Sequence, residues 1–109
     1  MEIELSNEKE FLIFKISGRL DTTTSDQLER EINDHIDQKI NNVILDFKNL
    51  NYISSAGLRV VLMLAKTMNE KKGKFFLTAL NQEVYQVFEI SGFLNILTVK
   101  ATIQEAIGE

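Results

Sequence analysis

Residues 51 to 62 of this 109-residue chain read Asn51-Tyr52-Ile53-Ser54-Ser55-Ala56-Gly57-Leu58-Arg59-Val60-Val61-Leu62. It follows an apolar run at residues 43–47 and overlaps a short polar segment at residues 48–51. Two serines, an alanine and a glycine then lead into apolar residues with helical spacing. The pattern predicts a buried strand, a turn, and a helix that begins at the pair of hydroxyl groups.

Ser54 and Ser55 can serve two purposes at that helix start. A serine is a favoured N-cap, because its side-chain oxygen accepts an unpaired backbone N–H of the first turn. The same N–H groups and the positive end of the helix dipole also suit a phosphate. These residues alone are consistent with a capped helix and with a serine that becomes phosphorylated.

The composition indicates one globular domain covering residues 1–109. Hydrophobic residues make up 44% of the chain and charged residues 26%, as in ordinary soluble domains. There is no cysteine and one histidine, His35, which excludes disulfides, thiolate nucleophiles and metal sites with several histidine ligands. No long apolar run and no secretory leader pattern occur, so we expect a cytoplasmic protein that does not enter a membrane.

The charge of the chain is negative and unevenly distributed. Twelve basic residues against 16 acidic ones give a net charge of −4, which argues against nucleic acid as a partner. Residues 21–37 are mostly acidic among their charged positions, and residues 59–74 are mostly basic. The two segments could steer a protein partner toward the chain, or they could be solvated helix faces.

The apolar spacing predicts the order β-β-α-β-α-β-α-β-α. Strands are expected at residues 1–6, 11–16, 43–47, 74–80 and 95–99, and helices at residues 24–40, 54–73, 82–91 and 101–107. Thr24 and Gln27 have the spacing of a capping box for the first helix. The first two strands should be antiparallel because a short turn joins them. The fold class is therefore α/β, with a mainly parallel mixed sheet of about five strands and four α-helices.

The second helix carries more apolar residues than one core-facing stripe needs. Val60, Met63 and Leu64 lie outside the stripe that begins with Leu58. Such a helix is either buried on most sides or exposes an interaction patch. A patch along Val60 and Met63 and packing against a neighbouring helix both remain open.

The sequence contains no recognisable catalytic set. It has no phosphate-binding P-loop, no glycine-rich dinucleotide motif and no nucleophile elbow. Asp46 stands where a receiver domain has its phosphorylated aspartate, but the acidic pair and the lysine of such a site are absent. We therefore expect a protein that binds another protein and is not an enzyme. An enzyme built on this chain would have to use Ser55 and Asp46.

Three short motifs together resemble the STAS domain family of anti-sigma-factor antagonists. They are Gly-Arg-Leu-Asp at 18–21, Val-Ile-Leu-Asp-Phe at 43–47 and Tyr-Ile-Ser-Ser-Ala-Gly-Leu at 52–58. The element order and the length match over essentially the whole chain. The family pattern at the helix start, Asp-Ser-Ser/Thr/Ala-Gly-Leu, aligns its phosphorylated serine with Ser55. Its aspartate falls on Ser54, which is a departure and leaves Ser54 as the alternative phosphorylation site.

The resemblance implies a partner switch. The unphosphorylated protein would bind an anti-sigma factor, usually a serine protein kinase of the histidine-kinase-like ATPase fold, and so release a sigma factor. Phosphorylation would dissociate the complex, and a metal-dependent serine phosphatase would reset it. No cofactor is expected, and the free protein should be a monomer or a weak dimer. The residues expected to contact the partner are Asp21, Ser54, Ser55, Gly57, Arg59, Val60 and Met63.

A second role within the same family stays open. The chain could be a regulatory or structural STAS subunit of another assembly that has no sigma factor. Such assemblies include a stressosome-like complex, a chemotaxis or second-messenger circuit, and a lipid-transport ATPase.

Overall fold

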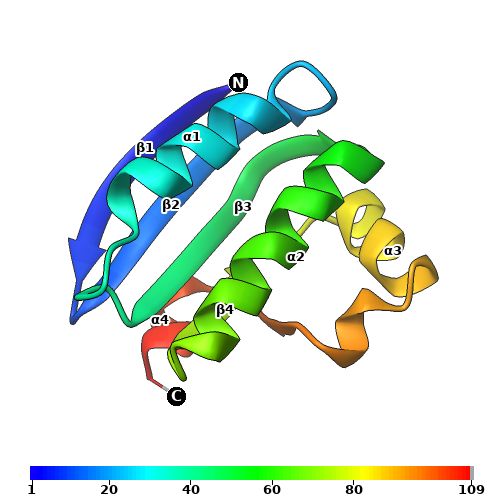
Figure 1. Ribbon diagram of the computed structural model, residues 1–109. Coiled ribbons are helices and arrows are strands. Elements are labelled where there is room, and N and C mark those ends of the chain that lie inside the picture. The colour runs from blue at the N-terminus through cyan, green and yellow to red at the C-terminus, as the bar shows by residue number, and fades with distance from the viewer. Residues whose placement is uncertain (109) are drawn as a thin grey trace.

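The computed structural model describes residues 1–108 of the chain. Figure 1 shows a twisted sheet with helices packed on it. The strands are β1 Glu2–Glu8, β2 Phe11–Leu20, β3 Asn42–Ile53, β4 Lys74–Thr78 and β5 Thr98–Lys100. The helices are α1 Ser25–His35, α2 Ser55–Glu70, α3 Gln82–Ile90 and α4 Ile103–Ile107, with a 3₁₀ turn η1 at Phe93–Asn95. The expected α/β architecture is confirmed, while several boundaries differ.

The strand order in the sheet is the order of the sequence, β1-β2-β3-β4-β5. β1 and β2 are antiparallel, and the other three pairs are parallel, as expected. Lys9 and Glu10 join the first two strands with φ angles of 47° and 71°. Positive φ at both residues of a two-residue turn suits the right-handed twist of a hairpin.

β3 is longer than the sequence pattern indicated. The expected turn at residues 48–51 is wrong, because the strand continues to Ile53 and stays paired with β2. Leu50 and Ile53 are buried while Lys48 and Asn49 are exposed, so the polar residues of this segment lie on the solvent side of a strand. β2 likewise stays in the sheet as far as Leu20, with two register shifts along the pair.

The first helix is shorter than expected. α1 ends at His35, and Ile36 is already extended with φ −90° and ψ 110°. Asp37 offers the chain a turn instead, because its carboxylate accepts the N–H of Lys39 at 2.8 Å. Ile36 and Ile40 still pack against the core, which explains why their spacing resembled a longer helix. At the other end of the chain, β5 begins three residues later than expected and η1 precedes it.

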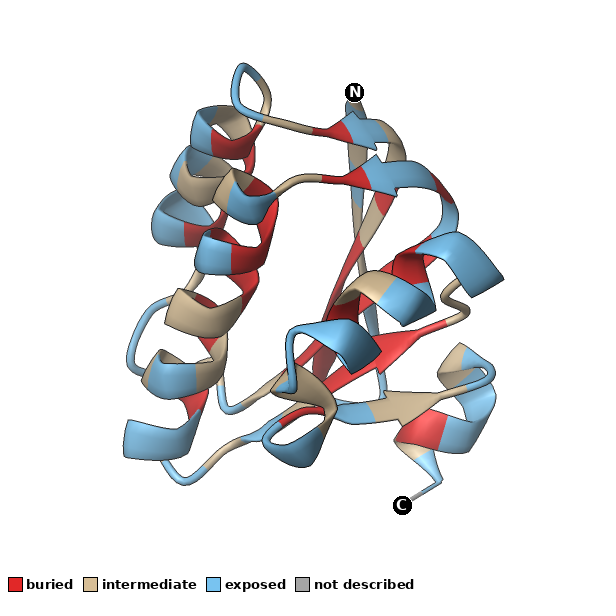
Figure 2. Ribbon diagram, turned by 90° about the vertical axis from the view of Figure 1, so that its right-hand side faces the viewer, coloured by how far each residue is buried: buried red, intermediate tan, exposed pale blue. Residues whose placement is uncertain are grey.

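Within the described part of the chain, helices cover both faces of the sheet, three on one face and one on the other. α1, α2 and α3 contribute to one large cluster of buried residues on one face, and Figure 2 shows the buried side of α1 and α2 turned toward the strands. α4 covers part of the other face through Ala106, which packs with Ile13, Ile44 and Phe76. β3 lies between both clusters, so residues 43–47 are all buried. Among residues 1–108, no helix is long and apolar enough to cross a membrane.

Phe88 tests how α3 is held on the sheet. Its ring is fully buried and stacks on Phe47 of β3 at a centroid distance of 6.5 Å. We expect Phe88→Ala to lower the free energy of unfolding by about 3–5 kcal/mol, because it leaves a cavity between helix and sheet. Ile90→Ala on the same helix is the control, since Ile90 is 85% exposed. Urea denaturation measures both, and similar losses for the two variants would contradict this account of α3.

Candidate functional site

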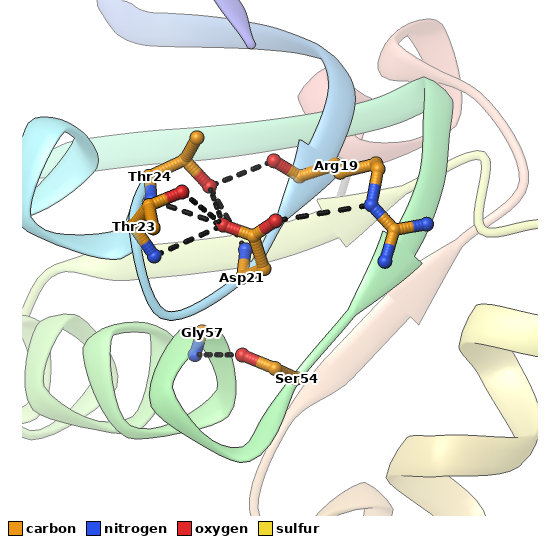
Figure 3. A network of polar contacts seen from close by, with 6 residues as sticks. All are labelled: Arg19, Asp21, Thr23, Thr24, Ser54 and Gly57. Atoms are coloured by element: carbon orange, nitrogen blue, oxygen red, sulfur yellow. Dashed lines mark hydrogen bonds and ion pairs between the residues drawn. The ribbon is translucent and has the colours of Figure 1, made fainter.

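The site is built from two loops that leave neighbouring parallel strands. β2 ends at Leu20 and β3 at Ile53, and these two residues face each other in the sheet. The N–H of Ser54 donates to the carbonyl oxygen of Leu20 at 2.9 Å, which holds the two loops together. Sites in α/β proteins lie at such carboxyl ends of strands. The structure therefore brings Asp21 beside Ser54, as Figure 3 shows.

Ser54 is the N-cap of α2. Its φ and ψ of −97° and 175° are extended, and its hydroxyl oxygen accepts the N–H of Gly57 at 3.3 Å. The carbonyl oxygen of Ser54 accepts the N–H of Leu58 at 2.9 Å, which begins the helical bonding. The side chain of Ser54 is half-buried and occupied by this role.

Ser55 is the first residue of α2 and is exposed. Because the cap is supplied by Ser54, the hydroxyl of Ser55 is not needed to begin the helix. The first turn contains no acidic residue that would repel an anion. Ser54 is therefore the capping serine, and the side chain of Ser55 is not engaged in that role.

Gly57 is buried beneath this helix start. A Cβ at this position would lie 2.8 Å from Leu20 Cγ and 2.9 Å from Ile53 Cγ1. The close approach of α2 to the ends of β2 and β3 therefore requires glycine. The structure assigns Gly57 to packing, although the sequence placed it among the partner contacts.

The predicted apolar patch on α2 is wrong at Val60. Its side chain is fully buried in the main core, so it presents no surface to a partner. The alternative, packing within the protein, is the one that the structure supports. Met63 is half-buried, and Arg59 is exposed. The outward face of α2 is therefore more polar than its sequence suggested.

Asp21 organises the loop between β2 and α1. Its Oδ1 accepts the N–H of Thr23 at 3.0 Å, the N–H of Thr24 at 3.1 Å and the hydroxyl of Thr23 at 2.8 Å. Hydrogen bonds from the Thr23 hydroxyl and then the Thr24 N–H hold the pKa of Asp21 below its ordinary value. Figure 3 shows this network against the start of α2.

Thr24 contributes to the same loop in an unexpected way. It precedes α1, but its side chain makes no capping bond to the helix. Its hydroxyl instead donates to the carbonyl oxygen of Arg19 at 2.7 Å and accepts the N–H of Asp21 at 2.8 Å. The capping box predicted for Thr24 and Gln27 is therefore wrong, because the hydroxyl of Thr24 is already bonded to the backbone of the loop at Arg19 and Asp21.

Arg19 and Tyr52 lie beside the candidate site; they belong to the motifs at 18–21 and 52–58, but the sequence did not place them among the partner contacts. They are register partners on β2 and β3, and the guanidinium carbon of Arg19 lies 4.2 Å from the centre of the Tyr52 ring. Arg19 Nε also lies 3.8 Å from Asp21 Oδ2. A cation over an aromatic ring is favourable, and Tyr52 remains 41% exposed. Only the register between the strands could have revealed this pair.

Asp46 does not belong to this site. It is buried, accepts the hydroxyl of Thr78 at 2.9 Å, and lines a groove of about 540 Å³ together with residues of α4. α2 packs on the opposite face of the sheet. The structure therefore does not join Asp46 to Ser55 as an enzyme would need. Among residues 1–108 no group of three or more histidine and acidic side chains could hold a metal ion.

Comparison with known proteins adds the family. The family model described as "STAS domain" matches residues 2–106. The chain belongs to the STAS domain family. BtrV of Bordetella bronchiseptica, which is named as an anti-sigma factor antagonist, is 40% identical over 99 residues, covering 91% of this chain and 85% of BtrV. The anti-sigma F factor antagonist of Paenibacillus polymyxa is 30% identical, covering 91% of this chain and 86% of that protein.

Solved STAS structures have the same fold. The anti-sigma factor antagonist SpoIIAA in its unphosphorylated form superposes with a TM-score of 0.82 at 26% identity, covering 97% of this chain and 93% of SpoIIAA. SpoIIAA from Bacillus in its phosphorylated form gives 0.76 at 25% identity, covering 98% and 97%. The expected resemblance to this family is confirmed.

The N-cap of α2 can be tested by mutation. Ser54→Ala removes the oxygen that accepts the N–H of Gly57, and we expect it to lower the free energy of unfolding by about 1 kcal/mol. Ser54→Asp should stay close to the parent, because aspartate caps as well as serine and carries a charge that suits the helix dipole. Urea denaturation of the three proteins measures the effect. Equal stability of the alanine variant and the parent would show that Ser54 is not the cap.

The lowered pKa of Asp21 predicts that the difference in stability between the parent and Asp21→Asn depends on pH. Its carboxylate has a lowered pKa in the folded protein, so its contribution is present above the pKa of an unfolded aspartate, about 3.9. That contribution is lost as the pH falls through the folded pKa. The stability gap between the parent and Asp21→Asn should therefore be widest near neutral pH and shrink below about pH 4. Urea midpoints across this range measure it, and a constant gap would contradict the proposed role of the carboxylate.

Proposed function

We propose that the chain is an anti-sigma-factor antagonist that works as a partner switch, with Ser55 as the phosphorylated residue. The observation that carries the proposal is the division of work between the two serines. Ser54 is engaged as the N-cap of α2, whereas Ser55 is exposed on the first turn. The names of the relatives and the family of the chain support the same function.

The proposed switch begins with transfer of a phosphoryl group from ATP. The Oγ of Ser55 forms a bond to the γ-phosphorus while the bond to the oxygen bridging to the β-phosphate breaks. ADP leaves, and the hydroxyl proton passes to a base of the kinase. The kinase is the anti-sigma factor itself, with the histidine-kinase-like ATPase fold. A metal-dependent serine phosphatase later transfers the phosphoryl group to water and restores the free hydroxyl.

The modification can break a complex without unfolding the domain. Phosphoserine adds a charge of about −1.5 to −2. The backbone N–H groups and the dipole of α2 accept that charge within the chain. At a protein interface the same charge would be desolvated, which is costly unless the partner supplies a cation. The phosphorylated chain is therefore expected to be stable but poorly bound.

The proposed partner surface surrounds Ser55. The contacts expected there are Asp21, Ser54, Ser55, Arg59 and Met63, and the exposed pair of Arg19 and Tyr52 extends the surface across the end of the sheet. Tyrosine and arginine are enriched among residues that dominate binding energy. Gly57 and Val60 act from beneath by fixing the position of α2. We place the protein in the cytoplasm, as a monomer or weak dimer in the free state.

Variants of Ser55 test the switch. Ser55→Asp should lose binding to the partner kinase, because it places a charge at the centre of the interface, and Ser55→Ala should bind but resist release by ATP. Ser54→Asp is the matched control: aspartate is the residue of the family pattern at this position, and it would cap α2 in place of the serine, so its charge is held at the helix start and binding is expected to be kept. Pull-down with the anti-sigma kinase, followed by intact-mass measurement with and without ATP, gives both readouts. The assignment fails if both Ser55 variants bind and release like the parent, or if the phosphate maps to Ser54.

A further inference from the structure

Arg59 lies on the same exposed stripe of α2 as Ser55. Residues four apart on a helix lie one above the other, and both of these are exposed, whereas Val60 and Val61 face the core. Long helical side chains lean toward the N-terminus of their helix. Arg59 is therefore placed so that its side chain can reach the turn that begins at Ser55.

The present partner of Arg59 is a weak one. Its Nη2 lies 3.5 Å from Oε1 of Glu29 on the neighbouring helix α1. The Arg59 side chain is 60% exposed and that of Glu29 is 30% exposed, so water screens the pair. Exposed ion pairs of this kind contribute little to stability. The guanidinium group is thus free to change partners at small cost.

A phosphate on Ser55 would be a stronger partner than Glu29. It carries more charge than a carboxylate, and the planar guanidinium group can donate two parallel hydrogen bonds to it. We propose that, once Ser55 is phosphorylated, Arg59 exchanges its ion pair with Glu29 for the phosphate one turn before it on α2. This inference rests on the proposed phosphorylation of Ser55.

The exchange makes the switch act twice. The phosphate introduces negative charge at the centre of the partner surface, and it also withdraws the cation of Arg59 from that surface into an intramolecular pair. Before phosphorylation, an acidic group of a partner would face the charge-balanced pair of Arg59 and Glu29. After the exchange, it would face the unpaired carboxylate of Glu29 and be repelled. Arg59 is therefore a positioning residue: it holds the phosphate, and by doing so it changes the charge of the partner surface.

Other charges near Ser55 stay constant in the test. Arg19, near the end of β2, is held by Asp21 and by Tyr52 of β3, and Asp26 is exposed on the first turn of α1. Lys66 provides a control cation on the same helix. It follows Ser55 by eleven residues, about 16 Å along the helix axis, which is beyond the screening length at physiological salt.

The test uses phosphoserine placed at position 55 by genetic encoding, so no kinase is needed. The midpoint of the phosphorus-31 NMR titration reports the charge around the phosphate. Arg59→Gln should raise the midpoint by about 0.2 to 0.4 pH units, because the cation that favours the dianion is lost. Lys66→Gln should leave it unchanged. Glu29→Gln should lower it, and this effect should shrink in the Arg59→Gln background if it acts through Arg59.

Equal midpoints for the Arg59→Gln and Lys66→Gln proteins would overturn the exchange. Thermal unfolding of each variant checks that the exposed substitutions leave the fold intact. Failure of the partner switch would look different, because it would appear as absent phosphorylation by the kinase or as unchanged partner binding. The titration of the encoded phosphoserine would still report on Arg59 in that case.

Discussion

The hydrogen bond from the N–H of Ser54 to the carbonyl oxygen of Leu20 is the constraint on which the site depends. It ties the ends of β2 and β3 at the point where both strands leave the sheet. Gly57 then lets α2 approach Leu20 and Ile53 closely enough for Ser54 to act as the N-cap. Ser55 follows as the first residue of the helix and is exposed beside this cap.

The order of the elements and the helix start could be predicted from the sequence because they follow from local patterns. Five consecutive buried positions at 43–47 indicate a central strand, and two serines before a glycine and an apolar run indicate a capped helix. Features that depend on neighbours could not be predicted in this way. The polar segment 48–51 is part of β3 only because β2 pairs with it. Val60 is buried only because the fold covers that side of α2.

The polar surface around Ser55 combines one rigid part with one adaptable part. Asp21 accepts several hydrogen bonds within a short loop, which leaves its carboxylate little freedom. The contact between Arg59 and Glu29 is longer, exposed and shared between two helices. A modification of the surface is therefore expected to move the second contact and leave the first in place. Sites often join such a fixed scaffold to a few side chains that can change partners.

The identical order of strands in space and in sequence has a consequence for how the chain is made. Each strand after the first pairs with the edge that its predecessor left open, so none has to be inserted between two strands already in place. A nascent chain can therefore extend the sheet as each strand leaves the ribosome, beginning with the β1–β2 hairpin. The exposed edge moves along the growing sheet until β5 closes the series. Synthesis and assembly can then proceed in the same direction.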